Sequence, residues 1–195
     1  MIKENIGYIL QIATLTLTLM LGLFNAYQNK KLQRGQNIIS VTTNYRMKRC
    51  EQLKECGQKL MTNTEPELLK LNAEKSTMLC EAYTASETIS MIMHRHFPCD
   101  RELIDMAAEI VALATRYSKD FSDIKAFHEL EYKRKLFRIK CDIYTTADWN
   151  RIKSETDGVN SSAIDWTSYY KKIEKSFSDE LNEIKNEFEK LMTSK

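Results

Sequence analysis

The stretch Arg101–Phe121, RELIDMAAEIVALATRYSKDF, shows most directly how this chain folds. Apolar side chains recur in it at alternating steps of four and three residues: Leu103, Ala107, Ile110, Ala114, Tyr117 and Phe121. Because an α-helix turns once every 3.6 residues, this spacing places them on one face, which other helices must cover. The stretch therefore predicts an amphipathic helix within a helical bundle.

Helical spacing continues on the C-terminal side of this stretch. It persists through a further set of apolar residues, Tyr132, Leu136, Ile139 and Ile143. The sequence leaves open whether one helix runs to about Thr156 or whether the chain bends at 118–122. A cluster of Asp, Gly, Asn and Ser at 156–162 predicts a loop, and the apolar spacing after it predicts a last amphipathic helix from Trp166 to Leu191.

A helix also precedes the central stretch. Thr64 before Pro66 is typical of a helix start, with Thr64 as the capping hydroxyl and proline in the first turn. Pro98 ends this helix, and Asp100 is expected to cap the next one. The chain of 195 residues contains only 5 Gly and 2 Pro, so few sharp turns are possible. We therefore expect an all-α protein with an antiparallel helical bundle.

The N-terminus carries a different pattern, the uncharged run Ile6–Phe24, IGYILQIATLTLTLMLGLF. A helix needs about 20 residues to cross a bilayer, so this run predicts a transmembrane helix. A cleaved signal peptide is disfavoured, because its apolar core is shorter and Phe24 stands where a small residue belongs. The basic flank, Lys30, Lys31 and Arg34, predicts that the following chain lies on the cytoplasmic side of the inner membrane.

Polar and small residues share one face of this run: Gln11, Thr14, Thr18, Gly22 and Asn25. Their steps of 3 or 4 residues keep them within a narrow arc of a helix. Such a face allows close approach and hydrogen bonds between two membrane helices, so we expect the helix to self-associate. The alternative is that the threonine hydroxyls bond to their own backbone.

These patterns divide the chain into three parts. We expect a transmembrane helix with its basic flank at 1–34, a juxtamembrane stalk helix at 35–62 and a cytoplasmic helical bundle at 63–195. The five cysteines suit a reducing compartment, since their odd number and spacing suggest no disulfide framework.

Two stretches resemble a group of uncharacterised bacterial proteins that have one N-terminal transmembrane helix and a small helical cytoplasmic domain. The first is IISVTTNYRMKRCEQLKECGQKL, Ile38–Leu60, and the second is IYTTADWNRIKSE, Ile143–Glu155. The resemblance implies the same membrane topology and a bacterial source.

No motif for nucleotide binding, nucleophilic catalysis or structural zinc occurs in the sequence. His94, His96 and Cys99 include metal-ligand types, but residues two apart point to opposite sides of a helix. His128 lacks an identifiable orienting partner for a general base. We therefore expect no enzyme, no cofactor and no bound metal.

A second basic cluster comprises Lys133, Arg134, Lys135, Arg138 and Lys140. Without a basic domain or a groove-reading motif it does not predict nucleic-acid binding. The expected partners are the lipid bilayer, further copies of the chain and an unidentified protein. The leading hypothesis is a membrane-anchored interaction or scaffold protein, and the alternative is an oligomeric membrane-permeabilising effector, with a role in bacterial defence suggested by analogy of architecture alone.

Overall fold

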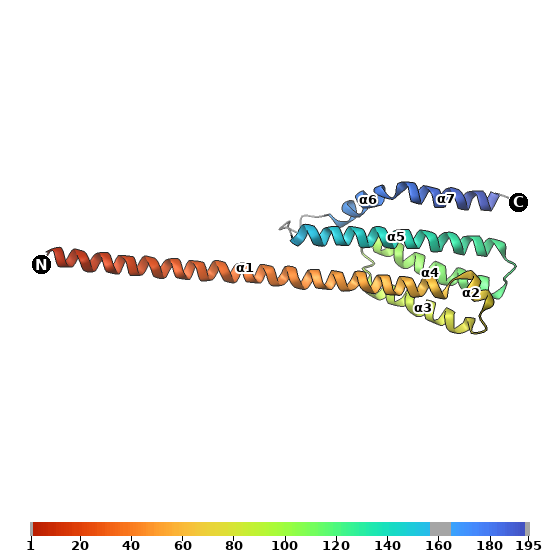
Figure 1. Cartoon of the computed structure of the whole chain (residues 1–195), viewed down its shortest axis with the longest axis horizontal. Helices are drawn as coiled ribbons and strands as arrows, with labels where there is room; N and C mark the ends of the chain where they lie inside the picture. Colours follow the sequence, from red (N-terminus) through yellow and green to blue (C-terminus); the bar gives the residue numbers. More distant parts are fainter. Residues whose placement is uncertain (1, 157–164, 194–195) are drawn as a thin grey trace. The chain divides into compact units, whose positions relative to one another are not determined.

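The computed structural model describes residues 2–156 and 165–193, with side chains described for 14–33, 40–154 and 165–193. These residues form helices, labelled α1 to α7 in Figure 1, and no strand. The expected all-α class is confirmed. The chain divides into two compact units, Met1–Asn44 and Tyr45–Lys195.

The first unit consists of the N-terminal part of α1 (Ile2–Asn63). Every side chain from 14 to 33 is exposed. As far as the structure describes them, no helix contains a stretch both long enough and apolar enough to cross a membrane, so the predicted transmembrane helix is not supported. The side chains of 6–13, the first part of the predicted run, lie outside the described residues.

The second unit is a helical bundle. Its helices after α1 are α2 (Pro66–Leu71), α3 (Lys75–Ile92), α4 (Pro98–Lys119), α5 (Ile124–Thr156), α6 (Trp166–Ser176) and α7 (Ser178–Thr193). The helices α3, α4 and α5 follow one another in antiparallel order, and α6 and α7 pack along α5 (Figure 1). The C-terminal part of α1, at 45–63, belongs to this unit.

One apolar core joins these helices. Its fully buried side chains come from α1, α2, α3, α4 and α5 and include Leu53, Leu60, Leu69, Ile89, Leu103, Ile110, Leu130, Phe137 and Tyr144. The helix α7 closes one side of α5, where Phe188 stacks on Tyr132 with the ring centroids 4.3 Å apart. The apolar face expected at Arg101–Phe121 is thus covered within the chain, whereas the one after Trp166 is buried at Trp166 and Tyr170 and only partly covered on α7, which has no buried residue.

Short polar side chains set the breaks between helices. Asp123 accepts a hydrogen bond from the amide of Ala126 at 2.9 Å, and Asp120 accepts one from Ser122, which together end α4 and start α5. Of the two alternatives at 118–122, the chain therefore adopts two helices. Asn72 accepts from the amide of Glu74 at 2.8 Å and separates α2 from α3, a break that helical spacing did not predict.

Two expected caps are wrong. The Thr64 hydroxyl donates to the Leu60 carbonyl of α1 at 2.7 Å, so it satisfies the end of that helix instead of capping α2. Asp100 lies inside the first turn of α4, which begins at Pro98, and it is fully buried. The predicted last helix is interrupted at Phe177, and the predicted loop at 156–162, apart from Thr156, lies outside the described residues.

Candidate functional site

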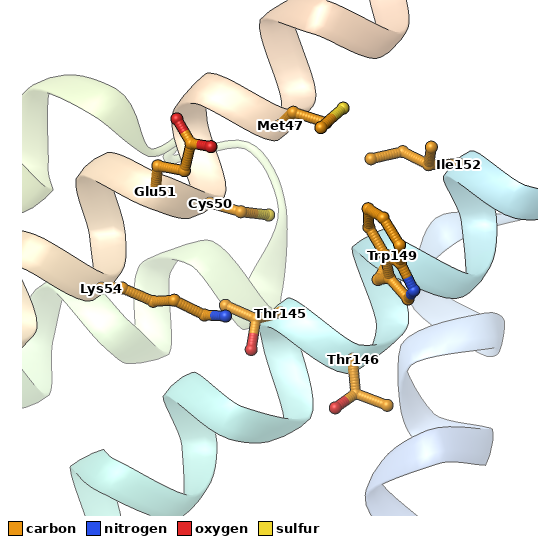
Figure 2. A pocket seen from close by; sticks show the side chains of 8 residues that line it. All are labelled: Met47, Cys50, Glu51, Lys54, Thr145, Thr146, Trp149 and Ile152. Atoms are coloured by element: carbon orange, nitrogen blue, oxygen red, sulfur yellow. The ribbon is translucent and has the colours of Figure 1, made fainter.

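Two cavities lie between α1 and α5, both inside the second unit. We call the first the Trp149 cavity; it measures about 430 Å³ and is lined by Met47, Cys50, Glu51, Lys54, Thr145, Thr146, Trp149 and Ile152 (Figure 2). We call the second the Gly57 cavity; it measures about 410 Å³ and includes Gly57, Met61, Phe137 and Arg138. Lys54 lines both, so the two cavities are neighbours, and we refer to them together as the α1–α5 groove.

The face of α1 beneath this groove is formed by buried residues at helical spacing, Arg49, Leu53, Gly57, Leu60 and Thr64. Gly57 faces α5 at Phe137, and a Cβ atom there would lie 3.6 Å from the Phe137 ring, an ordinary van der Waals contact. Leu53 and Leu60 are fully buried in the core. Arg49 lies on the same face of α1, so its positive charge is buried in a contact that is otherwise mostly apolar.

Arg49 meets Asp148 of α5 in a buried ion pair, with Nη2 and Oδ2 3.2 Å apart. The Asp148 side chain is fully buried, and the Cys50 thiol donates to the same Oδ2 at 3.3 Å. The Arg49 guanidinium also lies 5.6 Å from the centroid of the Tyr144 ring. Tyr144 in turn packs edge-on against Trp166 of α6. The pair thus connects α1 to α5 and, through Tyr144, to α6.

A second carboxylate, Asp100, lies close to this pair. It accepts the backbone amide of His94 at 2.8 Å and the thiol of Cys99 at 3.5 Å, which fixes the turn between α3 and α4. Burial by itself would lower the pKa of Arg49, but Tyr144, Asp148 and Asp100 outweigh burial and raise it. The guanidinium therefore remains charged, paired with Asp148 and further stabilised by the nearby charge of Asp100.

The buried polar centre is only partly satisfied by the residues that the structure describes. Four of its buried polar atoms have no hydrogen-bond partner among them: Arg49 Nε, Asp148 Oδ1, Tyr144 Oη and Tyr170 Oη. Unpaired buried polar groups cost stability, and a buried ion pair can be less favourable than apolar residues of the same volume. The buried Arg49–Asp148 pair is therefore better explained as a contact that specifies how α1 pairs with α5 than as one that adds stability.

The thiol groups and the Tyr144 hydroxyl of this centre hold their protons. Burial, with Asp148 nearby, raises the pKa of the Cys50 thiol to about 12, and burial with Asp100 nearby raises that of Cys99 to about 12. Burial also raises the pKa of Tyr144 far above its usual range. Because the thiolate is the reactive form of cysteine, neither thiol is an activated nucleophile.

The predicted association face is partly described. Thr14, Thr18, Gly22 and Asn25 are all exposed, and a Cβ atom on Gly22 would meet no atom within 4 Å. The Thr18 hydroxyl donates to the Thr14 carbonyl at 2.8 Å, which is the backbone bonding considered as the alternative. Gln11 lies outside the residues with described side chains.

The basic flank is described in part as well. Lys30 and Lys31 are exposed, and the side chain of Arg34 lies outside the described residues.

Four residues of the second basic cluster, Lys133, Arg134, Lys135 and Lys140, are paired with acidic residues. Buried Arg134 binds Glu65 and Glu131 and also donates to the Met61 carbonyl at 3.0 Å. Buried Lys140 lies between Glu102 and Glu174, at 2.7 and 2.5 Å. Two further pairs join Lys133 to Glu109 and Lys135 to Glu187. The cluster therefore connects helices of the bundle.

The histidines of the H-x-H-x-x-C motif are not brought together with Cys99. His94 and His96 are exposed in the turn before α4, whereas Cys99 is buried. Among the described residues, no group of three or more His, Cys, Asp or Glu side chains is placed to hold a metal ion. His128 is half-buried, with its ring edge-on to Phe127.

Sequence reasoning missed the pairing of Arg49 with Asp148. Arg49 stands four residues before Leu53 on a buried stripe of α1. On α5, Asp148 likewise stands four residues after the buried Tyr144 and so lies on the same buried face. A charge at a core position in each of two helices was the available signal. Notably, the two residues come from the two stretches, Ile38–Leu60 and Ile143–Glu155, that carry the resemblance described above.

No family model, no curated protein and no solved structure matches this chain. The function is therefore argued from the geometry of the molecule.

Proposed function

We propose that this chain is a single-pass membrane protein that anchors a helical interaction domain to the cytoplasmic face of the inner membrane. The observation that carries the proposal is the apolar surface of α1 at 14–24. Its large apolar side chains are all exposed: Leu15, Leu17, Leu19, Met20, Leu21, Leu23 and Phe24.

These side chains cover the helix surface except for the narrow face of Thr14, Thr18, Gly22 and Asn25, because successive residues turn by 100°. A helix that exposes apolar side chains over most of its circumference requires an apolar environment around it, either a protein core or a lipid bilayer. Uncharged sequence extends from Asn5 to Asn29, so the apolar character continues beyond the side chains discussed. A bilayer supplies such an environment along about 20 residues of helix.

The charges that follow support one orientation. Lys30, Lys31 and Arg34 come directly after the uncharged run, and basic residues near a membrane helix favour the cytoplasmic side. In this orientation the bundle is cytoplasmic, and the exposed lysines lie at the level of anionic headgroups.

The bundle supports a role in binding. Its α1–α5 groove presents the half-exposed Trp149 beside buried apolar residues, a composition that protein and ligand contacts favour. The small and polar face of Thr14, Thr18, Gly22 and Asn25 supports association between copies in the membrane. The proposed partners are thus the bilayer, a second copy of the chain and a protein.

Membrane fractionation of the full chain tests the anchor. We expect the chain to remain with the membrane pellet after alkaline carbonate extraction. Leu17→Arg combined with Leu21→Arg should release it, because each arginine at the centre of a membrane helix costs about 2.5–3.5 kcal/mol or more.

The matched control is Tyr83→Arg combined with Met91→Arg. These residues are also large, apolar and exposed, but they lie on α3 of the bundle. The control should stay in the membrane pellet. A soluble wild-type chain, or equal release of both double variants, would contradict the anchor.

The orientation has its own test at Cys80, the exposed cysteine of α3. We expect a membrane-impermeant thiol reagent to label Cys80 only after the cells are lysed. Labelling in intact cells would place the bundle outside.

A further inference from the structure

The Trp149 cavity has the size of a small-molecule site, since such sites usually measure about 300–1,000 Å³. Its walls come from two helices that both belong to the second unit, α1 and α5. The cavity opens to solvent beside Trp149, whose side chain is 48% exposed, and it is closed on one side by the buried Ile152.

The two ends of the cavity differ in chemistry. Figure 2 shows Met47, Trp149 and Ile152 facing one another at one end, with the Cys50 sulfur pointing toward the Trp149 ring. At the other end, the Lys54 side chain extends toward Thr145. An apolar group therefore fits the first end, and a polar group fits the second.

Charge decides what the polar end accepts. Lys54 forms no ion pair with any residue that the structure describes, and the carboxylate of Glu51 points away from it in Figure 2. The Thr145 hydroxyl donates to the Asp142 carbonyl of its own helix at 3.2 Å, whereas no such bond is found for the Thr146 hydroxyl among the described residues. Lys54 and Thr146 are thus the available donors at this end.

The floor of the cavity adds no charge of its own. The Cys50 thiol keeps its proton at neutral pH, because burial raises its pKa to about 12, and it donates that proton to Asp148. The ammonium group of Lys54 is consequently the charge that a bound molecule meets at the polar end.

We propose that the Trp149 cavity binds a small carboxylate amphiphile, with its hydrocarbon tail between Met47, Trp149 and Ile152 and its carboxylate on Lys54. The tail contacts α1 through Met47 and α5 through Trp149 and Ile152. Such a ligand joins the two helices directly above the Arg49–Asp148 pair. Binding therefore stabilises the packing of α1 on α5. The site does not depend on the membrane anchor.

The test uses the full chain in nanodiscs of zwitterionic lipid, with octanoate as the probe. We expect a saturable change in tryptophan fluorescence and a rise in the unfolding temperature of the bundle. Octylammonium, which has the same tail and the opposite charge, should produce neither effect. Empty nanodiscs, titrated by calorimetry, correct for partitioning of both probes into lipid.

Two variants locate the site. Lys54→Met should weaken octanoate binding at least tenfold, and Trp149→Ala should abolish the fluorescence change and the thermal shift. Lys59→Met is the matched control, since Lys59 is exposed on the same helix and does not line the cavity. It should bind octanoate like the wild type.

Equal binding of octanoate and octylammonium would overturn the proposal, as would wild-type affinity in Lys54→Met. Absence of any saturable binding would overturn it too. Release of the chain from membranes by Leu17→Arg with Leu21→Arg tests only the anchor, so the two proposals fail separately.

Discussion

The two units of this molecule are both helical and both contain leucines, yet these leucines lie in opposite environments. Leu103 of α4 is fully buried, whereas Leu19 of α1 is 63% exposed. In the bundle, most of the apolar faces are covered by other helices of the chain. In the first unit, large apolar side chains are exposed over most of the helix surface. The difference shows that secondary structure alone does not tell whether a chain supplies its own apolar environment.

The largest expected effect comes from breaking the buried pair that joins α1 to the bundle. Asp148→Ala should lower the free energy of unfolding by about 3–5 kcal/mol, because it leaves the charge of the Arg49 guanidinium buried without its partner carboxylate. Chemical denaturation of the full chain in micelles, followed by near-ultraviolet circular dichroism, measures this loss.

Asp142→Ala is the control for that change, because Asp142 is exposed on the same helix. It should alter stability by less than about 0.5 kcal/mol. Replacing both members of the pair, Arg49→Met with Asp148→Leu, should restore most of the stability. If Asp148→Ala were tolerated as well as Asp142→Ala, the pair would contribute nothing to holding α1 on α5.

Truncating one leucine in each unit to alanine compares the contribution of a buried leucine to stability with that of an exposed one. Leu103→Ala should destabilise the bundle by about 3 kcal/mol, because it removes buried methyl groups and leaves a cavity. Leu19→Ala should change the same unfolding transition by less than about 0.5 kcal/mol, because the Leu19 side chain is exposed. The same denaturation experiment measures both, and equal losses would contradict the division into two units.

The smallest expected effect concerns association of the N-terminal helices. Interhelical contacts in membranes are worth about 0.6–2 kcal/mol each, so Thr18→Leu with Gly22→Leu should weaken self-association several-fold. Energy transfer between donor- and acceptor-labelled full chains in vesicles measures it. Thr16→Leu, on the opposite face, is the control and should associate normally. If Thr16→Leu weakened self-association as much as Thr18→Leu with Gly22→Leu, the helices would not associate through the assigned face.

Local pattern was sufficient for much of the bundle. The spacing of Leu103, Ala107 and Ile110 predicted the buried face of α4, because helical periodicity depends only on neighbours in the chain. Short polar residues were harder to interpret. Thr64 and Asp100 both looked like caps, yet each has a different partner in the structure, since a hydroxyl or carboxylate bonds whichever donor or acceptor the fold brings near.

The second basic cluster shows the same limit. Five cations close together in sequence suggest a charged surface, but Arg134 and Lys140 are buried and reach carboxylates on other helices. Burial alone would lower the pKa of Lys140, and the hydrogen bonds and charges of Glu102 and Glu174 outweigh this and raise it. Such pairing follows from helix arrangement, which sequence spacing does not specify.

The sequence by itself determined that this protein is all-α, which face of each main helix is apolar, and that an uncharged run precedes a basic flank. All of these follow from residues a few positions apart. Only the tertiary structure decided that Arg49 meets Asp148, 99 residues further on, and that a groove with Trp149 at its rim opens above them. Periodicity defines a face but does not name the helix that covers it, because that choice depends on how all the faces pack together at once.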